Sequence, residues 1–158
     1  MMKVEEEVGR LLGEKGLTLA VAESCTGGLV GHQITSASGS SAYFLGGIIA
    51  YSNEVKIREL NVDAEAIDRH GAVSQEVAMQ MAAGIKAKFG SDIGLGLTGI
   101  AGPEGGSRDK PVGLVYMVLA DGKKYVKQCC RFDGDRSHVK AISSQTALEM
   151  IREYVVDL

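Results

Sequence analysis

Residues 20–28 read Ala-Val-Ala-Glu-Ser-Cys-Thr-Gly-Gly, and this stretch organises the rest of the chain. An apolar run over residues 17–22 leads directly into two hydroxyl-bearing side chains and two glycines, and apolar residues at helical spacing follow over residues 29–34. The pattern predicts a β-strand, a tight turn and the start of a helix. Ser24 and Thr26 therefore fall at the carboxyl end of a strand, which is where open α/β sheets bind their ligands.

The turn after this strand has two interpretations. A nucleophilic Ser24 beside backbone N–H groups is the minimum needed for acyl transfer, with N–H groups of Thr26, Gly27 and Gly28 available to an oxyanion. The same N–H groups at a helix N-terminus also favour anion binding. Alternatively, the stretch is only a capped strand-to-helix turn, because Ser and Thr are common N-caps.

Length and composition restrict the class of protein. The chain has 158 residues, a length that predicts one domain over residues 1–158. Its net charge is −3 and it has no basic run, so we expect no direct binding of nucleic acid. No apolar run approaches the roughly 18 residues of a membrane helix. Cys25, Cys129 and Cys130 form no C-x-x-C pair, so we expect free thiols in the cytoplasm. The scattered histidines predict no metal site.

Turn and capping signals divide the chain into alternating helices and strands. We expect strands over residues 17–22, 44–51, 92–98, 112–120 and 124–132, of which 44–51 has the pattern of a buried strand and the last two form a hairpin. We expect helices over residues 4–15, 27–35, 54–60, 63–70, 74–89 and 137–155. This order predicts an α/β fold, a single three-layer α/β/α domain with a mixed, mostly parallel sheet and a C-terminal β-hairpin plus helix.

Lys56 is a candidate general base. It falls in the first turn of the helix expected from about Glu54, where the positive end of the helix dipole and any burial lower the pKa of its amine. A neutral amine in that position can take a proton. The alternative is a solvent-exposed lysine on a short helix.

Other polar residues stand where elements begin or end. Thr98 closes a strand before the glycine-rich loop 99–111 and is either a pocket residue or a turn hydroxyl. Arg136 precedes the last helix and either binds a phosphate with two hydrogen bonds or pairs with a neighbouring aspartate. Ser41 lies in a serine-rich loop and either caps a turn or lines a pocket. A sheet would bring several of these positions together.

Two familiar patterns fail their context tests. Residues 94–99 match the G-x-G-x-x-G dinucleotide fingerprint, but they lie inside an expected strand that no helix follows. The S-x-x-K matches at residues 107–110 and 137–140 lack the companion K-T-G of penicillin-binding enzymes.

A series of motifs along nearly the whole chain resembles the carboxy-terminal domain of the CinA family, the competence/damage-inducible proteins. The motifs are Ala22-Glu-Ser-Cys-Thr-Gly-Gly28, Gly39-Ser-Ser-Ala42, Tyr51-Ser-Asn-Glu-Val-Lys56, Gly71-Ala-Val-Ser74, Gly99-Ile-Ala-Gly-Pro103, Gly105-Gly-Ser107, Lys110-Pro-Val-Gly113 and Gly134-Asp-Arg136. The stand-alone form of this domain is similar to nicotinamide-nucleotide amidohydrolase. That enzyme, also called NMN deamidase, converts nicotinamide mononucleotide (NMN) and water to nicotinate mononucleotide and ammonia.

The resemblance implies a Ser/Lys dyad that works without a metal or other cofactor. Ser24 would be the nucleophile, Lys56 its base, and Ser41 an alternative or assisting hydroxyl. Three further residues match pocket positions of the family: Tyr51, Thr98 and Arg136. The resemblance also implies NMN as the small-molecule partner and a homo-oligomer as the assembly.

Two other functions stay open at this point. One is a non-catalytic nucleotide-binding or adaptor domain, since the family is associated with competence and the DNA-damage response. The other is hydrolysis of an amide in a different pyridine or nucleotide substrate.

Overall fold

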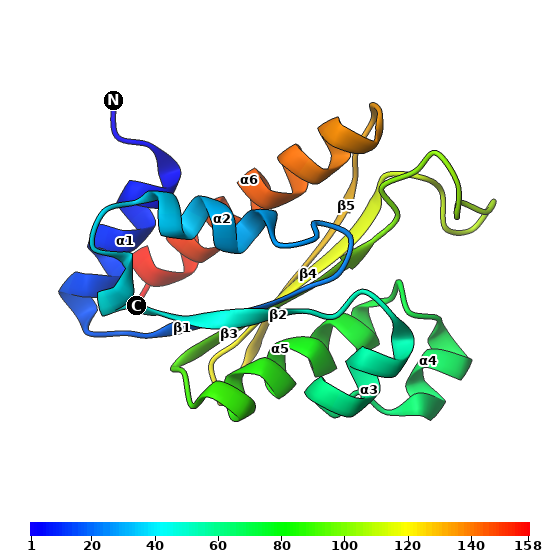
Figure 1. Ribbon diagram of the computed structural model, residues 1–158, viewed down its shortest axis with the longest axis horizontal. Helices are drawn as coiled ribbons and strands as arrows, with labels where there is room; N and C mark the ends of the chain where they lie inside the picture. The colour runs from blue at the N-terminus through cyan, green and yellow to red at the C-terminus, as the bar shows by residue number, and fades with distance from the viewer.

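Five strands form one sheet between two layers of helices (Figure 1). The computed structural model describes all residues from 1 to 158. The strands are β1 (Leu19–Glu23), β2 (Phe44–Ile49), β3 (Ile93–Gly99), β4 (Leu114–Ala120) and β5 (Tyr125–Arg131). The helices are α1 (Val4–Lys15), α2 (Leu29–Ser36), the short 3₁₀ helix η1 (Ser40–Ala42), α3 (Asn53–Leu60), α4 (Ala64–His70), α5 (Gln75–Phe89) and α6 (Arg136–Val156).

Helices α1, α2 and α6 cover one face of the sheet, and α3, α4 and α5 lie on the other (Figure 1). The expected three-layer α/β/α architecture with a final hairpin and helix is therefore confirmed. No helix is both long and apolar enough to cross a membrane.

The strand order is β2-β1-β3-β4-β5, and the sheet is mixed, as expected. Strand β1 pairs in parallel with both β2 and β3, whereas β3–β4 and β4–β5 are antiparallel. Parallel pairs thus equal antiparallel pairs in number and do not outnumber them. The three parallel strands end at the same edge of the sheet, so the segments that follow β1, β2 and β3 meet there.

The two faces of the sheet are packed differently. Leu95 and Leu97 of β3 point into a large apolar cluster formed with α1, α2 and α6. Gly94 and Gly96 alternate with them on the opposite face, under α5. A Cβ added to Gly96 would lie 2.3 Å from the carbonyl oxygen of Ala78, so α5 packs directly against the backbone of β3.

Strand β2 differs from the expected buried strand. It forms an edge of the sheet, and Leu45, Gly47 and Ile49 are exposed along one side of it. An apolar run identifies a strand but does not show whether both faces are covered, which explains the error. The expected close backbone approach is present, because a Cβ on Gly47 would lie 2.6 Å from the carbonyl oxygen of Val21.

Substitution of Gly84 tests the close packing of α5 against α3. Ala ordinarily stabilises a helix interior relative to Gly by about 1 kcal/mol, but a Cβ at Gly84 would lie 2.0 Å from the carbonyl oxygen of Leu60. We expect Gly84→Ala to lower the free energy of unfolding by about 1–3 kcal/mol, because backbone must move to admit the methyl group.

Gly13→Ala in α1 is the matched control, since a Cβ there meets nothing within 4 Å. It should be neutral or stabilising. Chemical denaturation of both variants measures the difference, and equal effects of the two substitutions would contradict the packing described here.

Candidate active site

Ser24 stands at the carboxyl edge of the sheet, directly after β1. Its backbone N–H donates to the carbonyl oxygen of Leu97 in β3 at 3.1 Å, so the sheet fixes its position. The residue is only 7% exposed and lines an open cavity of about 290 Å³.

Lys56 approaches Ser24 from helix α3. The helix is capped by Ser52, whose hydroxyl accepts the N–H of Val55 at 3.2 Å. The amine of Lys56 donates to the Ser24 hydroxyl at 3.0 Å and to the carbonyl oxygen of Tyr51 at 3.1 Å. The structure thus brings together the hydroxyl of one strand-to-helix connection and the amine of the next.

Burial sets the electrostatics of this pair. Lys56 is the only buried lysine of the chain, at 2% exposure, and its amine makes no ion pair. Loss of hydration is the larger cause and lowers its pKa from the ordinary 10.5, and the charge interaction with Cys25 acts in the opposite direction. Burial also raises the pKa of Cys25 to about 12, which keeps that thiol protonated. The site therefore favours an uncharged amine able to accept a proton from Ser24.

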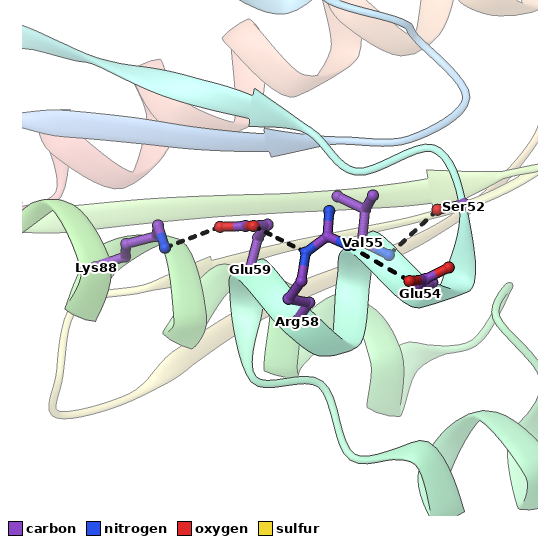
Figure 2. A network of polar contacts seen from close by, with 6 residues as sticks. All are labelled: Ser52, Glu54, Val55, Arg58, Glu59 and Lys88. Atoms are coloured by element: carbon purple, nitrogen blue, oxygen red, sulfur yellow. Dashed lines mark hydrogen bonds and ion pairs between the residues drawn. The ribbon is translucent and has the colours of Figure 1, made fainter.

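An ion-pair chain ties the exposed side of α3 to α5 (Figure 2). Arg58 contacts Glu54 at 3.4 Å and Glu59 at 3.1 Å, and Glu59 contacts Lys88 of α5 at 3.0 Å. Exposed pairs of this kind each contribute less than about 1 kcal/mol. Their consequence is positional: the solvent side of α3 is linked to α5, while its buried side carries Lys56.

Tyr51 and Arg136 form one rim of the cavity. The guanidinium of Arg136 donates to the Tyr51 hydroxyl at 3.0 Å and to the carbonyl oxygen of Gly102 at 2.7 Å. Arg136 makes no ion pair with an aspartate, and one carboxylate, that of Glu104, also lines the cavity. No group of three or more His, Cys, Asp or Glu side chains is placed to hold a metal ion.

Thr98 and the glycine-rich loop also line the cavity. Thr98 is 1% exposed, and its hydroxyl donates to the carbonyl oxygen of Ala72 at 3.1 Å. Lys110 donates to the carbonyl oxygen of Val73 at 2.7 Å and thereby fastens the loop over residues 100–113 to the segment before α5. Thr98 is therefore both a wall residue and a turn hydroxyl.

The expected oxyanion donors need correction. Gly27 N–H donates to the carbonyl oxygen of Ser24 at 3.1 Å, and Gly28 N–H donates to Glu23 at 3.2 Å. Both groups are already bonded because the turn closes on itself. The N–H groups of Cys25 and Thr26 donate to no other residue, and Cys25 lines the cavity.

Thr26, Gly27 and Gly28 line a different hollow from the one that contains Ser24. This second hollow has a volume of about 440 Å³ and also includes His32 and Lys140. The three turn residues lie beside the candidate site without lining its cavity, so the structure does not place these residues at the substrate position expected for them.

Ser41 lies outside the site. It belongs to η1, which enters β2, and Phe44 at the start of β2 pairs with Leu19 at the start of β1. Ser24 follows the other end of β1, so the sheet separates the two serines by the length of a strand. Within one chain, this geometry keeps the Ser41 hydroxyl away from Ser24 and Lys56.

Glu23 was missed by the sequence analysis, although it precedes Ser24 directly. It is 2% exposed, and one carboxylate oxygen accepts the Thr26 hydroxyl at 2.5 Å and the N–H groups of Gly28 and Val30 at 3.2 and 3.0 Å. The other oxygen accepts the Gly31 N–H at 3.0 Å. A signal was present: an acidic residue that ends an apolar strand and precedes a helix can cap that helix.

Comparison with known proteins places this architecture in a family. The model of the CinA C-terminal domain matches residues 1–155. The chain belongs to this family.

Curated relatives in the family carry the same domain as part of a longer protein. A putative competence-damage inducible protein of Halothermothrix orenii is 52% identical over 151 residues, which cover 95% of this chain and 37% of the relative. A CinA-like protein of Citrifermentans bemidjiense is 50% identical over 154 residues, which cover 98% of this chain and 37% of the relative. The chain thus spans little more than a third of these relatives.

Solved structures of the family share the fold over its full length. A CinA superfamily protein from Klebsiella pneumoniae has a TM-score of 0.95 at 32% identity, covering 98% of this chain and 97% of its own. A competence/damage inducible protein from Agrobacterium tumefaciens has a TM-score of 0.88 at 36% identity, covering 96% and 95%.

The buried amine should cost stability in a pH-dependent way. We expect Lys56→Met to raise the free energy of unfolding near neutral pH by about 1–2 kcal/mol, because an apolar side chain of similar length needs no hydration. The unfolded chain keeps its proton on Lys56 up to about pH 10.5, whereas the folded protein releases it at lower pH. Wild-type stability from this group therefore rises with pH through that window.

The advantage of Lys56→Met should accordingly shrink as the pH approaches 10.5. Urea denaturation of both proteins at a series of pH values measures it. A variant less stable than wild type at neutral pH would show that the amine stabilises the fold.

Proposed function

We propose that this protein is an amidohydrolase that deamidates NMN to nicotinate mononucleotide, with Ser24 as nucleophile and Lys56 as its base. The observation that carries the proposal is the 3.0 Å hydrogen bond between the Ser24 hydroxyl and a buried amine that has no acidic partner. Membership of the CinA C-terminal domain family supports it, because the motifs of that domain resemble those of NMN deamidase.

The first half of the reaction forms an acyl-enzyme. The neutral Lys56 amine takes the proton of Ser24 as the serine oxygen attacks the carboxamide carbon. The N–H group of Cys25, which lines the cavity and donates to no other residue, is the donor available to the oxyanion of the tetrahedral intermediate. The protonated amine then gives its proton to the departing nitrogen, ammonia leaves, and the nicotinoyl group remains as an ester on Ser24.

The second half reverses the roles. Lys56, neutral again, takes a proton from water as the water oxygen attacks the ester carbon. Collapse of this second intermediate returns a proton from Lys56 to the serine oxygen. Nicotinate mononucleotide leaves, and no atom is required beyond those of substrate and water.

Arg136 supports a substrate that carries phosphate. It is the only arginine that lines the cavity, and a guanidinium binds phosphate with paired hydrogen bonds. Its present partners are neutral oxygens of Tyr51 and Gly102, which an anion can replace without breaking an ion pair. The reaction would serve pyridine nucleotide recycling in the cytoplasm, where free thiols stay reduced.

Removal of either member of the proposed dyad should abolish turnover. We expect Ser24→Ala and Lys56→Ala each to lower kcat for ammonia release from NMN by more than about 1,000-fold, since residues that act as a unit fail together. Ammonia is measured with purified protein across a panel of NMN, nicotinamide, NAD and glutamine.

Ser41→Ala is the matched control, because Ser41 lies at the opposite edge of the sheet. It should keep wild-type activity. Full activity in Ser24→Ala or Lys56→Ala would remove that residue from the dyad. Tight binding of NMN by the wild type without any turnover would favour the non-catalytic nucleotide-binding alternative.

Arg136 should act on binding of the phosphate more than on chemistry. We expect Arg136→Met to raise KM for NMN by about 10-fold or more, from the loss of a charge-assisted pair of hydrogen bonds. The KM for nicotinamide riboside, which lacks the phosphate, should change much less. Equal changes for both substrates would assign Arg136 to the shape of the rim through Tyr51 and not to phosphate binding.

A further inference from the structure

We propose that Glu23 is a positioning residue for Ser24, and that it works by occupying the N-terminus of helix α2. The inference rests on the proposed function, since it explains how the nucleophile is held for that reaction. Glu23 does not line the cavity, so any effect on turnover must pass through Ser24 and its turn.

Strand geometry places Glu23 and Ser24 on opposite faces of the sheet. Successive residues of a strand point to opposite sides. The side chain of Glu23 bonds to α2 in one layer, while that of Ser24 bonds to Lys56 of α3 in the other. One peptide therefore links the two layers at the point of reaction.

The backbone of Glu23 is fixed from both sides. It pairs with Ile49 of β2 and Leu97 of β3, and its carbonyl oxygen accepts the N–H of Ala50 at 2.7 Å. With the strand held in this way, the carboxylate is the element that determines where the following turn lies. Its bonds to the Thr26 hydroxyl and to the N–H of Gly28 span the turn that begins at Ser24.

An ordinary helix cap does not account for this arrangement. The residue at the N-cap of α2 is Gly28, which has no side chain and a φ of 103°. The cap comes instead from a carboxylate five residues earlier, which reaches across the nucleophile turn. A Ser or Asp at the N-cap position would satisfy the helix N–H groups without contacting the turn. The carboxylate of Glu23 also bonds to Thr26 and Gly28 and so helps to fix the backbone position of residues 24–28.

The same contacts decide which donors remain for the substrate. A helix N-terminus is normally an anion site, but here Gly28, Val30 and Gly31 donate to Glu23. The N–H groups of Cys25 and Thr26 are left free. Glu23 thus directs the substrate's developing charge to the donors beside Ser24 and away from the end of the helix.

The test compares Glu23→Gln with Asp92→Asn. Glutamine keeps the size of Glu23, but its amide nitrogen must face at least one N–H donor. We expect kcat for NMN to fall by about 10- to 100-fold, the cost of a small displacement of a reacting group, while KM stays close to wild type. The rate constant for labelling of Ser24 by a fluorophosphonate should fall in parallel, at an unchanged folded fraction.

Asp92→Asn is matched in chemistry and remote in place. Its carboxylate accepts the N–H and the hydroxyl of Thr18 at 2.8 and 3.0 Å, at the opposite end of β1 and β3. We expect this variant to lower stability and to leave kcat and labelling unchanged. A role of Glu23 in stability alone would make the two variants behave alike.

A second pair covers the case in which Glu23→Gln does not fold. Thr26→Val removes only the hydroxyl that donates to Glu23, and Thr26→Ser restores it. Slower labelling of Ser24 in Thr26→Val with recovery in Thr26→Ser supports the inference. Labelling at the wild-type rate in folded Glu23→Gln or in Thr26→Val overturns it.

The outcomes separate this inference from the proposed function. Wild-type protein that releases no ammonia from NMN, but whose Ser24 is labelled in a Glu23-dependent way, refutes the substrate and keeps the positioning role. Wild-type protein that shows neither ammonia release nor labelling refutes both.

Discussion

The contact between the Lys56 amine and the Ser24 hydroxyl depends on burial without charge compensation. Burying a charged lysine without a partner costs free energy, and pairing it with a carboxylate would raise its pKa and keep the amine protonated. Here the amine meets a hydroxyl and a carbonyl oxygen, both neutral. A base must reach the serine proton and must not hold a proton of its own. The hydrogen bond to Ser24 meets the first requirement, and the lack of an acidic partner for the amine meets the second.

Maintaining such a contact requires that the surrounding layers cannot relax. The small residues on one face of β3 let α5 lie against the strand backbone, and Gly84 lets α3 lie against α5 in the same way. The end of helix α3 at Leu60 is therefore in direct contact with the backbone of α5 at Gly84. A looser interface would let the amine reach water, and a hydrated amine would regain its ordinary pKa.

The helix boundaries could be predicted from the sequence because capping and stop signals depend only on neighbouring residues. Caps at Ser52 and Ser74 and the stop at Gly90 define helices whatever surrounds them, and all three are present. Lys56 was predicted as a candidate base from its place in the first turn of a helix. Its burial depends on elements far away in the sequence, such as α5, and the residues next to Lys56 in the sequence do not indicate it. The exposure of β2 was missed for the same reason, since strand order is a property of the whole chain.

Ser41 and Glu23 show what chain order and strand alternation can add to motif reading. A residue that enters a parallel strand lies at the edge opposite to one that leaves it, so the separation of Ser41 from Ser24 within one chain follows from chain order alone. Leu19, Val21 and Glu23 share one face of β1 by alternation, and the first two are core residues against α2 and α6. A carboxylate continuing that face is buried under the helix that follows, where donors of the turn and of the helix N-terminus satisfy it. The motif around Ser24 therefore places the proposed nucleophile and a buried carboxylate on two sides of the sheet, and the N–H groups of Gly28 and Gly31 donate to that carboxylate.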